Sequence, residues 1–151
     1  MLKDEDRRIL RYLQSDPTLS HAELAERTRL SPQSITRRIA RLEEVGILKG
    51  VCARIDWQKL GYSVEVSLRF TLDKTQPRAF DEFLDAARSV PEVLEMQTFL
   101  GRVDVRLSVI ARDMAHYQEV YRDRILTLPH IAEIEALMHV ARIKSEEALP
   151  I

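Results

Sequence analysis

The sequence contains a single cysteine, Cys52, so no disulfide can form within the chain. A chain without a disulfide framework is typical of a reducing compartment, and we expect this one in the cytoplasm. No apolar run approaches the roughly 20 residues of a membrane-spanning helix, and no signal peptide opens the sequence. These absences argue against a secreted disulfide scaffold and against a membrane protein.

An excess of charge of one sign is also missing. The 23 Lys and Arg residues nearly balance 24 Asp and Glu residues, and the net charge is −1. Any case for binding nucleic acid must therefore rest on where the charges lie. The four histidines show neither metal-ligand spacing nor a nucleophile–base arrangement. We accordingly expect no metal, no cofactor, no catalytic residues and no enzymatic activity.

One stretch of this balanced chain carries only positive charge. No acidic residue lies between Glu26 and Glu43. The interval holds five arginines, namely Arg27, Arg29, Arg37, Arg38 and Arg41. A local basic surface of this kind is what binding to the phosphates of DNA requires.

The same stretch has the signals of two helices joined by a tight turn. Ser20 and Glu23 have the spacing of a capping box for a short first helix. Ser31 followed by Pro32 begins a second helix, because Ser caps free N–H groups and Pro suits the first helical position. Gly46 stands where that helix would end. The pattern predicts a helix-turn-helix whose second helix is rich in arginine.

The second helix has an apolar stripe of Ile35, Ile39 and Leu42, which we expect to be buried. At about 100° per residue, Gln33 and Arg37 then fall on the opposite, exposed face. The amino-terminal part of a recognition helix usually meets base edges, and later turns meet the DNA backbone. The outward face of this helix is therefore the predicted reading surface.

We predict individual roles on this surface from side-chain chemistry. Gln33, Ser34 and Arg37 are expected to read bases, since Gln can bond adenine and Arg can bond guanine through two hydrogen bonds. Arg41 lies a turn later and is placed for phosphate. Arg38 lies at the edge of the buried stripe, where it could instead pair with an acid of the chain's first helix, expected over residues 4–14. The predicted DNA-binding set is Ser31, Gln33, Ser34, Thr36, Arg37, Arg38 and Arg41. An ordinary solvated basic helix face is the alternative.

Hydrophobic periodicity gives the remaining elements. Helical spacing predicts a first helix over residues 4–14, and the segment 47–55 reads as extended, either a wing or a linker strand. From residue 63 the period becomes two. The expected elements are a strand at 64–72, a helix at 80–87, strands at 93–100 and 104–111, a helix at 114–128 and a strand at 131–144. The order β-α-β-β-α-β predicts an α+β chain with a ferredoxin-like second domain.

The second face of this predicted sheet mixes charged and apolar residues. Its members are Arg69, Glu95, Arg106, Glu133 and Glu135, beside Phe99, Ile110 and Leu137. A face of this kind is often buried against a second subunit, so we expect at least a homodimer. A solvated sheet face is the alternative.

The turn between the two central strands, Gly101 to Asp104, is a candidate ligand site. Gly101 can take a positive φ and let a ligand approach backbone amides. Asp104 could accept an ammonium group, and Arg102 could contact a carboxylate. The predicted effector-binding set is Gly101, Arg102, Val103 and Asp104. Turn chemistry alone is the competing explanation for Gly101 and Asp104.

With both halves interpreted, the chain resembles the Lrp/AsnC family of bacterial and archaeal transcription regulators. The matching residues are Asp6, Ile9-Leu10, Leu13-Gln14, Glu23-Leu24-Ala25, Leu30-Ser31-Pro32, Arg38, Arg41-Leu42-Glu43, Gly46, Gly50, Gly101-Arg102-Val103-Asp104, Tyr117, Leu128-Pro129 and Leu149-Pro150. Three positions depart from the family: Arg29 and His130 where Gly is usual, and Val51 where Tyr is common.

The resemblance implies a winged helix-turn-helix at 1–50, a linker strand and turn at 51–62, and a βαββαβ effector-binding and oligomerisation domain at 63–151. It implies sheet-to-sheet dimers that assemble into tetramers or octamers, double-stranded DNA as partner, and a small effector, usually an amino acid. Two other functions stay open. Siroheme decarboxylases look like this family in fold, and an architectural protein would pack DNA with little sequence preference.

Overall fold

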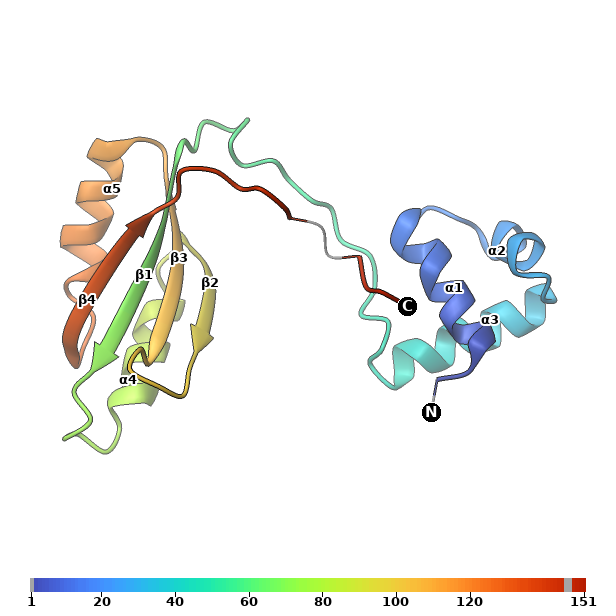
Figure 1. The fold of residues 1–151 in the computed structure, drawn as a ribbon, viewed down its shortest axis with the longest axis horizontal. Coiled ribbons are helices and arrows are strands. Elements are labelled where there is room, and N and C mark those ends of the chain that lie inside the picture. Colours follow the sequence, from blue (N-terminus) through green and yellow to red (C-terminus); the bar gives the residue numbers. More distant parts are fainter. Residues whose placement is uncertain (1, 146–147) are drawn as a thin grey trace. The chain divides into compact units, whose positions relative to one another are not determined.

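The computed structural model describes residues 2–145 and 148–151 and divides into two compact units (Figure 1). The helical unit comprises the sequence up to Arg54 together with 144–151, and the sheet unit comprises Ile55–Ile143. The expected boundaries at 50 and 62 therefore bracket the division at 54. The segment 144–151, expected in the second domain, groups with the first.

The helical unit contains α1 (Asp4–Ser15), α2 (His21–Thr28) and α3 (Pro32–Glu44). The predicted capping box forms at α2: Ser20 N donates to a Glu23 carboxylate oxygen at 2.8 Å, and Glu23 N donates to Ser20 Oγ at 3.2 Å. These caps satisfy N–H groups that a helix start leaves unpaired. The helices enclose a small core of Ile9, Leu19, Leu24, Ala25, Ile35 and Ile39.

Residues 45–63, all described, form neither helix nor strand, so the extended segment expected at 47–55 does not become a regular wing or linker strand. Gly46 and Gly50 both have positive φ, at 72° and 102°. Those angles interrupt an extended backbone, and a strand also needs a paired neighbour for its N–H and C=O groups. No strand pairing involves this segment.

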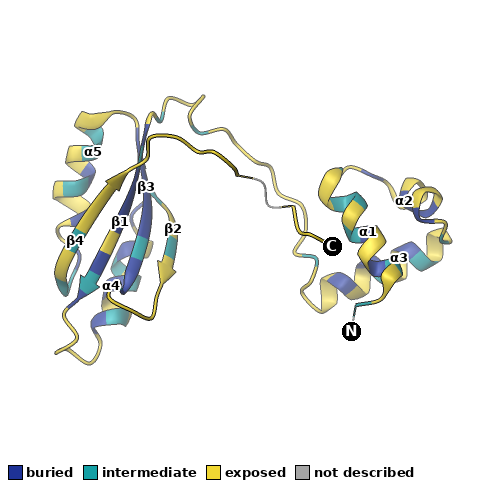
Figure 2. Ribbon diagram, in the orientation of Figure 1, coloured by how far each residue is buried: buried dark blue, intermediate teal, exposed yellow. Residues whose placement is uncertain are grey.

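The sheet unit confirms the predicted order β-α-β-β-α-β. Its elements are β1 (Val64–Leu72), α4 (Ala79–Arg88), β2 (Val93–Thr98), β3 (Val105–Ala111), α5 (Met114–Val120), the π turn η1 (Tyr121–Ile125) and β4 (Ile131–Met138). The antiparallel sheet has strand order β2-β3-β1-β4, and α4 and α5 both lie on one face (Figure 1). Figure 2 shows the buried residues concentrated on the central strands β1 and β3, while the edge strands are largely exposed.

Alternation along β1 puts Val66, Leu68 and Phe70 against the helices. Phe70 meets Phe83 of α4 with ring centroids 4.9 Å apart. The buried core of this unit consists of Val64, Val66, Leu68, Phe70, Leu72, Phe83, Ala87, Val105, Leu107, Val109, Ala111, Val120, Ile125 and Leu128.

Two predicted elements extend well past the observed ones, and the strand expected over 93–100 also ends early, at Thr98. The last strand was expected to reach residue 144 but ends at Met138, because Met138 pairs with Val66 close to the start of β1. The helix expected over 114–128 is α-helical only to Val120, after which the N–H of Leu126 bonds the carbonyl of Tyr121, the π pattern. Of the helices described, none is long and apolar enough to cross a bilayer.

Candidate nucleic-acid interface and ligand pocket

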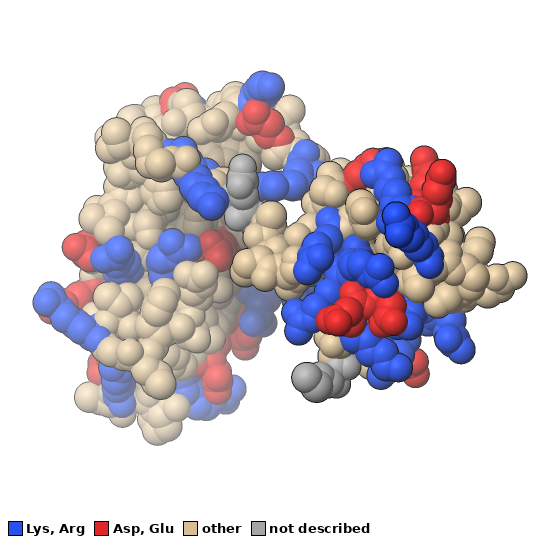
Figure 3. All heavy atoms as spheres, turned by 45° about the vertical axis from the view of Figure 1, so that its right-hand side comes forward, with Lys and Arg blue, Asp and Glu red and all other residues tan. Residues whose placement is uncertain are grey.

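The outward face of α3 presents most of the predicted DNA-binding residues to solvent. Ser31, Gln33, Thr36, Arg37 and Arg41 are exposed. The Ser31 hydroxyl accepts the N–H of Ser34 at 3.2 Å and so caps the helix. Figure 3 shows Lys and Arg side chains gathered around a small acidic patch on the helical unit. On the exposed face of α3, Gln33, Arg37 and Arg41 are therefore suited to contact base edges and phosphates.

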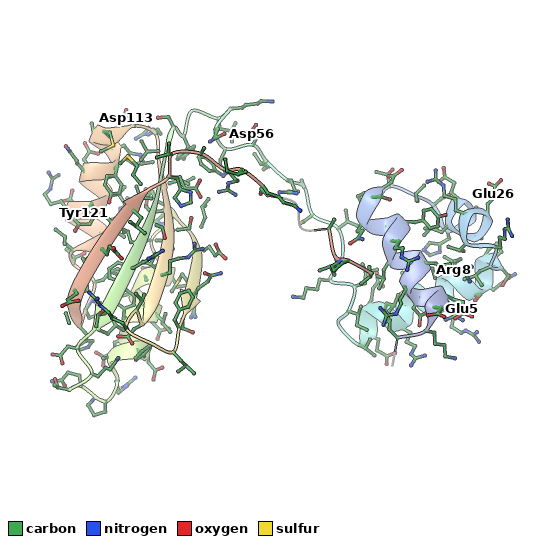
Figure 4. All side chains as sticks on the ribbon, in the orientation of Figure 1. Glu5, Arg8, Glu26, Asp56, Asp113 and Tyr121 are labelled. Atoms are coloured by element: carbon green, nitrogen blue, oxygen red, sulfur yellow. The ribbon has the colours of Figure 1, made fainter. Side chains whose placement is uncertain are left out.

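Arg38 has a different environment from the other arginines of α3. Its Nη1 lies 2.7 Å from Asp6 Oδ1, its Nη2 lies 3.7 Å from Glu5 Oε2, and its side chain is only 17% exposed. Glu5 lies on the first turn of α1 (Figure 4). The expectation that Arg38 pairs with an acid of the first helix is confirmed. Arg38 holds α1 against α3, and its Nε also donates to Ser34 Oγ at 3.3 Å.

Asp6 is the buried partner in this contact. Burial raises the pKa of its carboxyl group, but the hydrogen bond from Arg38 and that from the N–H of Lys3 outweigh burial and hold the pKa below its usual value. The carboxylate is therefore ionised near neutral pH. The pair positions α3 and leaves Ser34 and Arg38 less free for DNA than the sequence suggested.

The structure adds His21, which the sequence interpretation considered only as a metal ligand. Its Nδ1 lies 3.0 Å from the hydroxyl of Thr36, so the start of α2 meets the exposed face of α3. His21 is exposed and is the first residue of α2. In a helix-turn-helix the helix before the recognition helix crosses the DNA backbone. The capping signal at Ser20, which fixes His21 at the helix start, could have identified it.

Arg29 forms the turn between α2 and α3 in the left-handed conformation, with φ of 58°. The N–H of Leu30 then donates to the carbonyl of Ala25 at 3.0 Å, which closes the helix end. An L-residue other than Gly is strained in this region. The turn thus needs the conformation that Gly adopts easily, and this chain makes it with Arg.

The buried carboxylate of Asp104 holds the 101–104 turn in place. This residue is 2% exposed, and its Oδ2 accepts the N–H of Leu72 at 2.8 Å while Lys74 Nζ lies 2.8 Å from Oδ1. Burial raises the pKa of the carboxyl group, but Lys74 and the Leu72 N–H outweigh burial and lower it overall. Both oxygens already have partners. The direct contact with a ligand ammonium expected from the sequence would require displacing Lys74.

A pocket of about 590 Å³ lies beside this turn on the face of the sheet away from the helices. Arg102 and Val103 of the predicted set line it, but Gly101 and Asp104 do not. The Thr71 hydroxyl donates to the carbonyl of Arg102 at 3.0 Å and fixes the turn over the pocket. The remaining lining residues are Arg69, Glu133, Ile134 and Glu135. Groups of both charges converge here, which matches a small zwitterion.

The same sheet face carries the charged set expected at a subunit contact. Arg69 and Arg106 stand opposite each other in the β1–β3 register. Each has an acidic partner within the chain: Arg106 Nη2 lies 2.7 Å from Glu95 and Arg69 Nη1 lies 3.7 Å from Glu135. Among the described residues, the buried Ser67 Oγ and Arg106 Nε find no hydrogen-bond partner. Polar atoms of this kind are usually satisfied by water or a partner.

Two family models match the chain in succession. A winged helix-turn-helix DNA-binding model matches residues 3–49, and the Lrp/AsnC ligand binding domain matches residues 65–149. Together they cover both units described above.

Known proteins with similar sequences span nearly the whole chain. DNA-binding transcriptional activator DecR of Escherichia coli is 33% identical over 154 residues, covering 100% of this chain and 99% of DecR. Transcriptional regulator AzlB of Bacillus subtilis is 30% identical over 151 residues, covering 100% of this chain and 96% of AzlB. A transcriptional regulator of Neisseria meningitidis solved as a complex with L-methionine has a TM-score of 0.90 at 27% identity, covering 99% and 97% of the two chains.

Proposed function

Since this chain belongs to the Lrp/AsnC family of transcriptional regulators, we propose that it binds a specific operator through α3 and responds to an amino acid bound beside the 101–104 turn. The proposal rests mainly on the different environments of the arginines of α3. Arg38 is fixed in the fold, whereas Arg37 and Arg41 are exposed one turn apart on the outward face.

On DNA, α3 lies in the major groove. Gln33 and Arg37 contact base edges, and Arg41 contacts phosphate, with Ser31, Ser34 and Thr36 contributing polar contacts around them. Arg38 acts indirectly, by holding α1 on α3. His21, beside Thr36, is placed for the phosphate backbone at the start of α2.

In the sheet unit, the effector's carboxylate is bound by Arg102 and its ammonium group by Glu133, both of which line the pocket. Asp104 supports the turn through Leu72 and Lys74 and so keeps Arg102 and Val103 at the pocket. An amino-acid effector is supported by the mixed charge of the pocket and by the L-methionine complex of the Neisseria regulator.

The protein works as a homodimer formed through the free sheet face, which assembles further into tetramers or octamers in the cytoplasm. A symmetric dimer presents two copies of α3 to half-sites about one helical turn apart, or a multiple of it. Light scattering that shows a monomer at micromolar concentration would refute this assembly.

The DNA arm of the test compares Arg37→Ala and Arg41→Ala. Losing a base contact at Arg37 should cost about 1–3 kcal/mol and relax specificity at one base pair. Losing a phosphate contact at Arg41 should weaken binding to all sequences and flatten the salt slope by about one unit. Arg8→Ala on α1 is the charge-matched control. If both α3 variants bind the operator like the parent, α3 is not the reading helix.

The effector arm is a thermal-shift screen against the twenty amino acids, since a compound that binds only the folded protein raises its melting temperature. Arg102→Ala should abolish the shift produced by the responding amino acid, whereas Arg78→Ala, outside the pocket, should retain it. An undiminished shift in Arg102→Ala would place the effector elsewhere. Tetrapyrrole absorbance in the purified protein would instead favour a siroheme decarboxylase. Equal affinity for operator and random DNA would favour an architectural protein.

A further inference from the structure

The helical unit has a groove that its three helices leave open. About 540 Å³ in volume, it runs between α1 and the segment that follows α3, with Leu10, Leu13, Ile47 and Leu48 among its walls. Leu149 and Ile151 complete the lining, although they follow the whole sheet unit in the sequence. The groove is thus closed by a segment that follows its other walls by at least 97 residues, the separation of Leu149 from Cys52.

The side-chain amide of Gln14 on α1 bonds both the backbone N–H and the backbone C=O of Leu149 in this segment. Its Nε2 donates to the carbonyl of Leu149 at 3.0 Å, and its Oε1 accepts the N–H of Leu149 at 2.9 Å. A side-chain amide that exchanges both bonds with a backbone residue reproduces one pair of an antiparallel ladder. Arg11, one turn earlier on α1, donates to the carbonyl of Ile151. The segment is therefore held in one register on α1.

These contacts are limited in extent. Leu149 keeps 62% of its surface exposed, so little apolar burial accompanies its hydrogen bonds. The hydrogen bonds that hold the segment, two from Gln14 and one from Arg11, involve none of the buried core residues of the helices, so breaking them leaves that core packed. A contact of this extent can dock and undock while the helical core stays intact.

In the sequence the docked segment follows β4, the strand that lines the candidate effector pocket, with residues 139–147 between them. Glu133, Ile134 and Glu135 of β4 face or border that pocket. Beyond Met138 the chain leaves the sheet unit after Ile143 and returns to the helical unit at Lys144. The sheet unit therefore has two covalent connections to the helical unit, and the second follows the strand that lines the pocket.

We propose that the groove on α1 is a docking site for residues 148–151 of this chain, and that the docked segment carries the effector's influence from β4 to the helical unit. This role rests on the proposed function, because it presupposes an operator and an effector. Binding at the pocket changes the position of β4, and the Gln14 contact transmits that change to the helices that carry α3. The occupant is the chain's own segment. The equivalent segment of a second copy is the alternative that the experiment separates.

The first measurement is amide hydrogen exchange on the full chain. The Leu149 N–H should be protected in the parent, and its exchange should rise at least about tenfold in Gln14→Leu, which removes both bonds and keeps a good helix former. Gln118→Leu, at an exposed position of α5, is the matched control. Equal exchange in Gln14→Leu and parent would overturn docking. Protection that is lost on dilution would assign the groove to a second copy and overturn the proposal for this chain's own segment.

The second measurement is operator affinity with and without the amino acid that shifts the melting temperature of the parent. Allosteric coupling typically changes affinity about 5–150-fold, and we expect this change to fall below about twofold in Gln14→Leu and in Leu149→Ser, with effector-free affinity retained. Leu149→Ser lies outside every helix, so it separates undocking from damage to α1. A full response in both variants would overturn the coupling role.

The two proposals fail differently. If the parent binds no operator or responds to no amino acid, the proposed function fails and the coupling role fails with it. Docking is still decided by hydrogen exchange. If the parent responds and both variants also respond, the proposed function stands and only the coupling is refuted.

Discussion

The two units of this chain are stabilised by different means. The sheet unit has fourteen buried apolar residues in its core cluster, whereas the helical unit has six among the residues described. A small unit buries a smaller fraction of its apolar surface on folding. The helical unit compensates with polar contacts: the capping box at α2, the Arg38–Asp6 pair and the Gln14 contact with Leu149. The orientation of α3 therefore depends on charges and hydrogen bonds as well as on packing.

Among the residues described, each unit also contains one buried aspartate with a cationic partner, and the partners differ in exposure. Arg38 is 17% exposed beside Asp6, and Lys74 is 56% exposed beside Asp104. If Asp104 is neutralised, Lys74 can be solvated by water. The guanidinium of Arg38 cannot be solvated in the same way, because it lies between α1 and α3. Similar pairs should therefore contribute differently to the two units.

The largest expected effect comes from truncating one fully buried leucine in each core. Leu24→Ala and Leu68→Ala should each destabilise their own unit by about 2–5 kcal/mol. In the helical unit a loss of this size approaches the whole stability of a small domain, so Leu24→Ala should unfold that unit alone. Calorimetry should show its transition separating from that of the sheet unit. A single transition lowered equally by both substitutions would mean that the two units unfold together.

The next effect concerns the buried aspartates. Asp6→Asn should destabilise the helical unit by about 1–3 kcal/mol, because it leaves the guanidinium of Arg38 poorly paired. Asp104→Asn should cost less, because Lys74 is exposed and the Asn oxygen can still accept the Leu72 N–H. Denaturant unfolding monitored for each unit measures the difference. Asp4→Asn, on the exposed first turn of α1, is the control, and a larger effect at Asp104 would reverse the comparison.

Acid should act on both units in the same pH range. The pKa values of Asp6 and Asp104 both lie below the ordinary 3.8. A carboxyl group with a lowered folded-state pKa contributes stability that is present above the unfolded-state pKa and is lost as pH falls below about 4. Stability between about pH 5 and 7 should therefore be insensitive to these groups. In Asp6→Asn the free energy of unfolding of the helical unit should depend less steeply on pH below about 4. An unchanged slope of that free energy against pH would show that other carboxyl groups dominate.

The smallest expected effect is a gain in stability. Arg29→Gly should stabilise the helical unit by about 1 kcal/mol, because Arg29 has a positive φ that Gly adopts without strain. Arg27→Gly, which removes the same charge from inside α2, should destabilise by about 1 kcal/mol. In the sheet unit, His130 also has a positive φ, but His130→Gly would lose its 2.6 Å contact with Glu82 and should gain less. Thermal unfolding decides the signs, and equal signs for Arg27 and Arg29 would contradict the argument.

The sequence predicted what depends on local patterns. Alternation along residues 64–72 identified β1, and Ser31-Pro32 identified the start of α3. The end of β4 could not be predicted, because it depends on where β1 stops offering a partner. The pairing of Asp104 with Lys74 and that of Gln14 with Leu149 join residues 30 and 135 positions apart, which local periodicity does not relate. The proposed contacts of α3 with DNA and of the pocket with an effector stay predictions.

The return of residues 148–151 to α1 also has a consequence for biosynthesis. Translation delivers α1 to α3 first, and the segment that closes their groove follows only after the entire sheet unit has been made. At about 5–20 residues per second, that delay lasts roughly 5–20 seconds. Throughout this interval Leu10 and Leu13 border an unfilled apolar groove on the nascent chain. The helical unit is thus the first part of this protein able to fold and the last to receive all of its contacts.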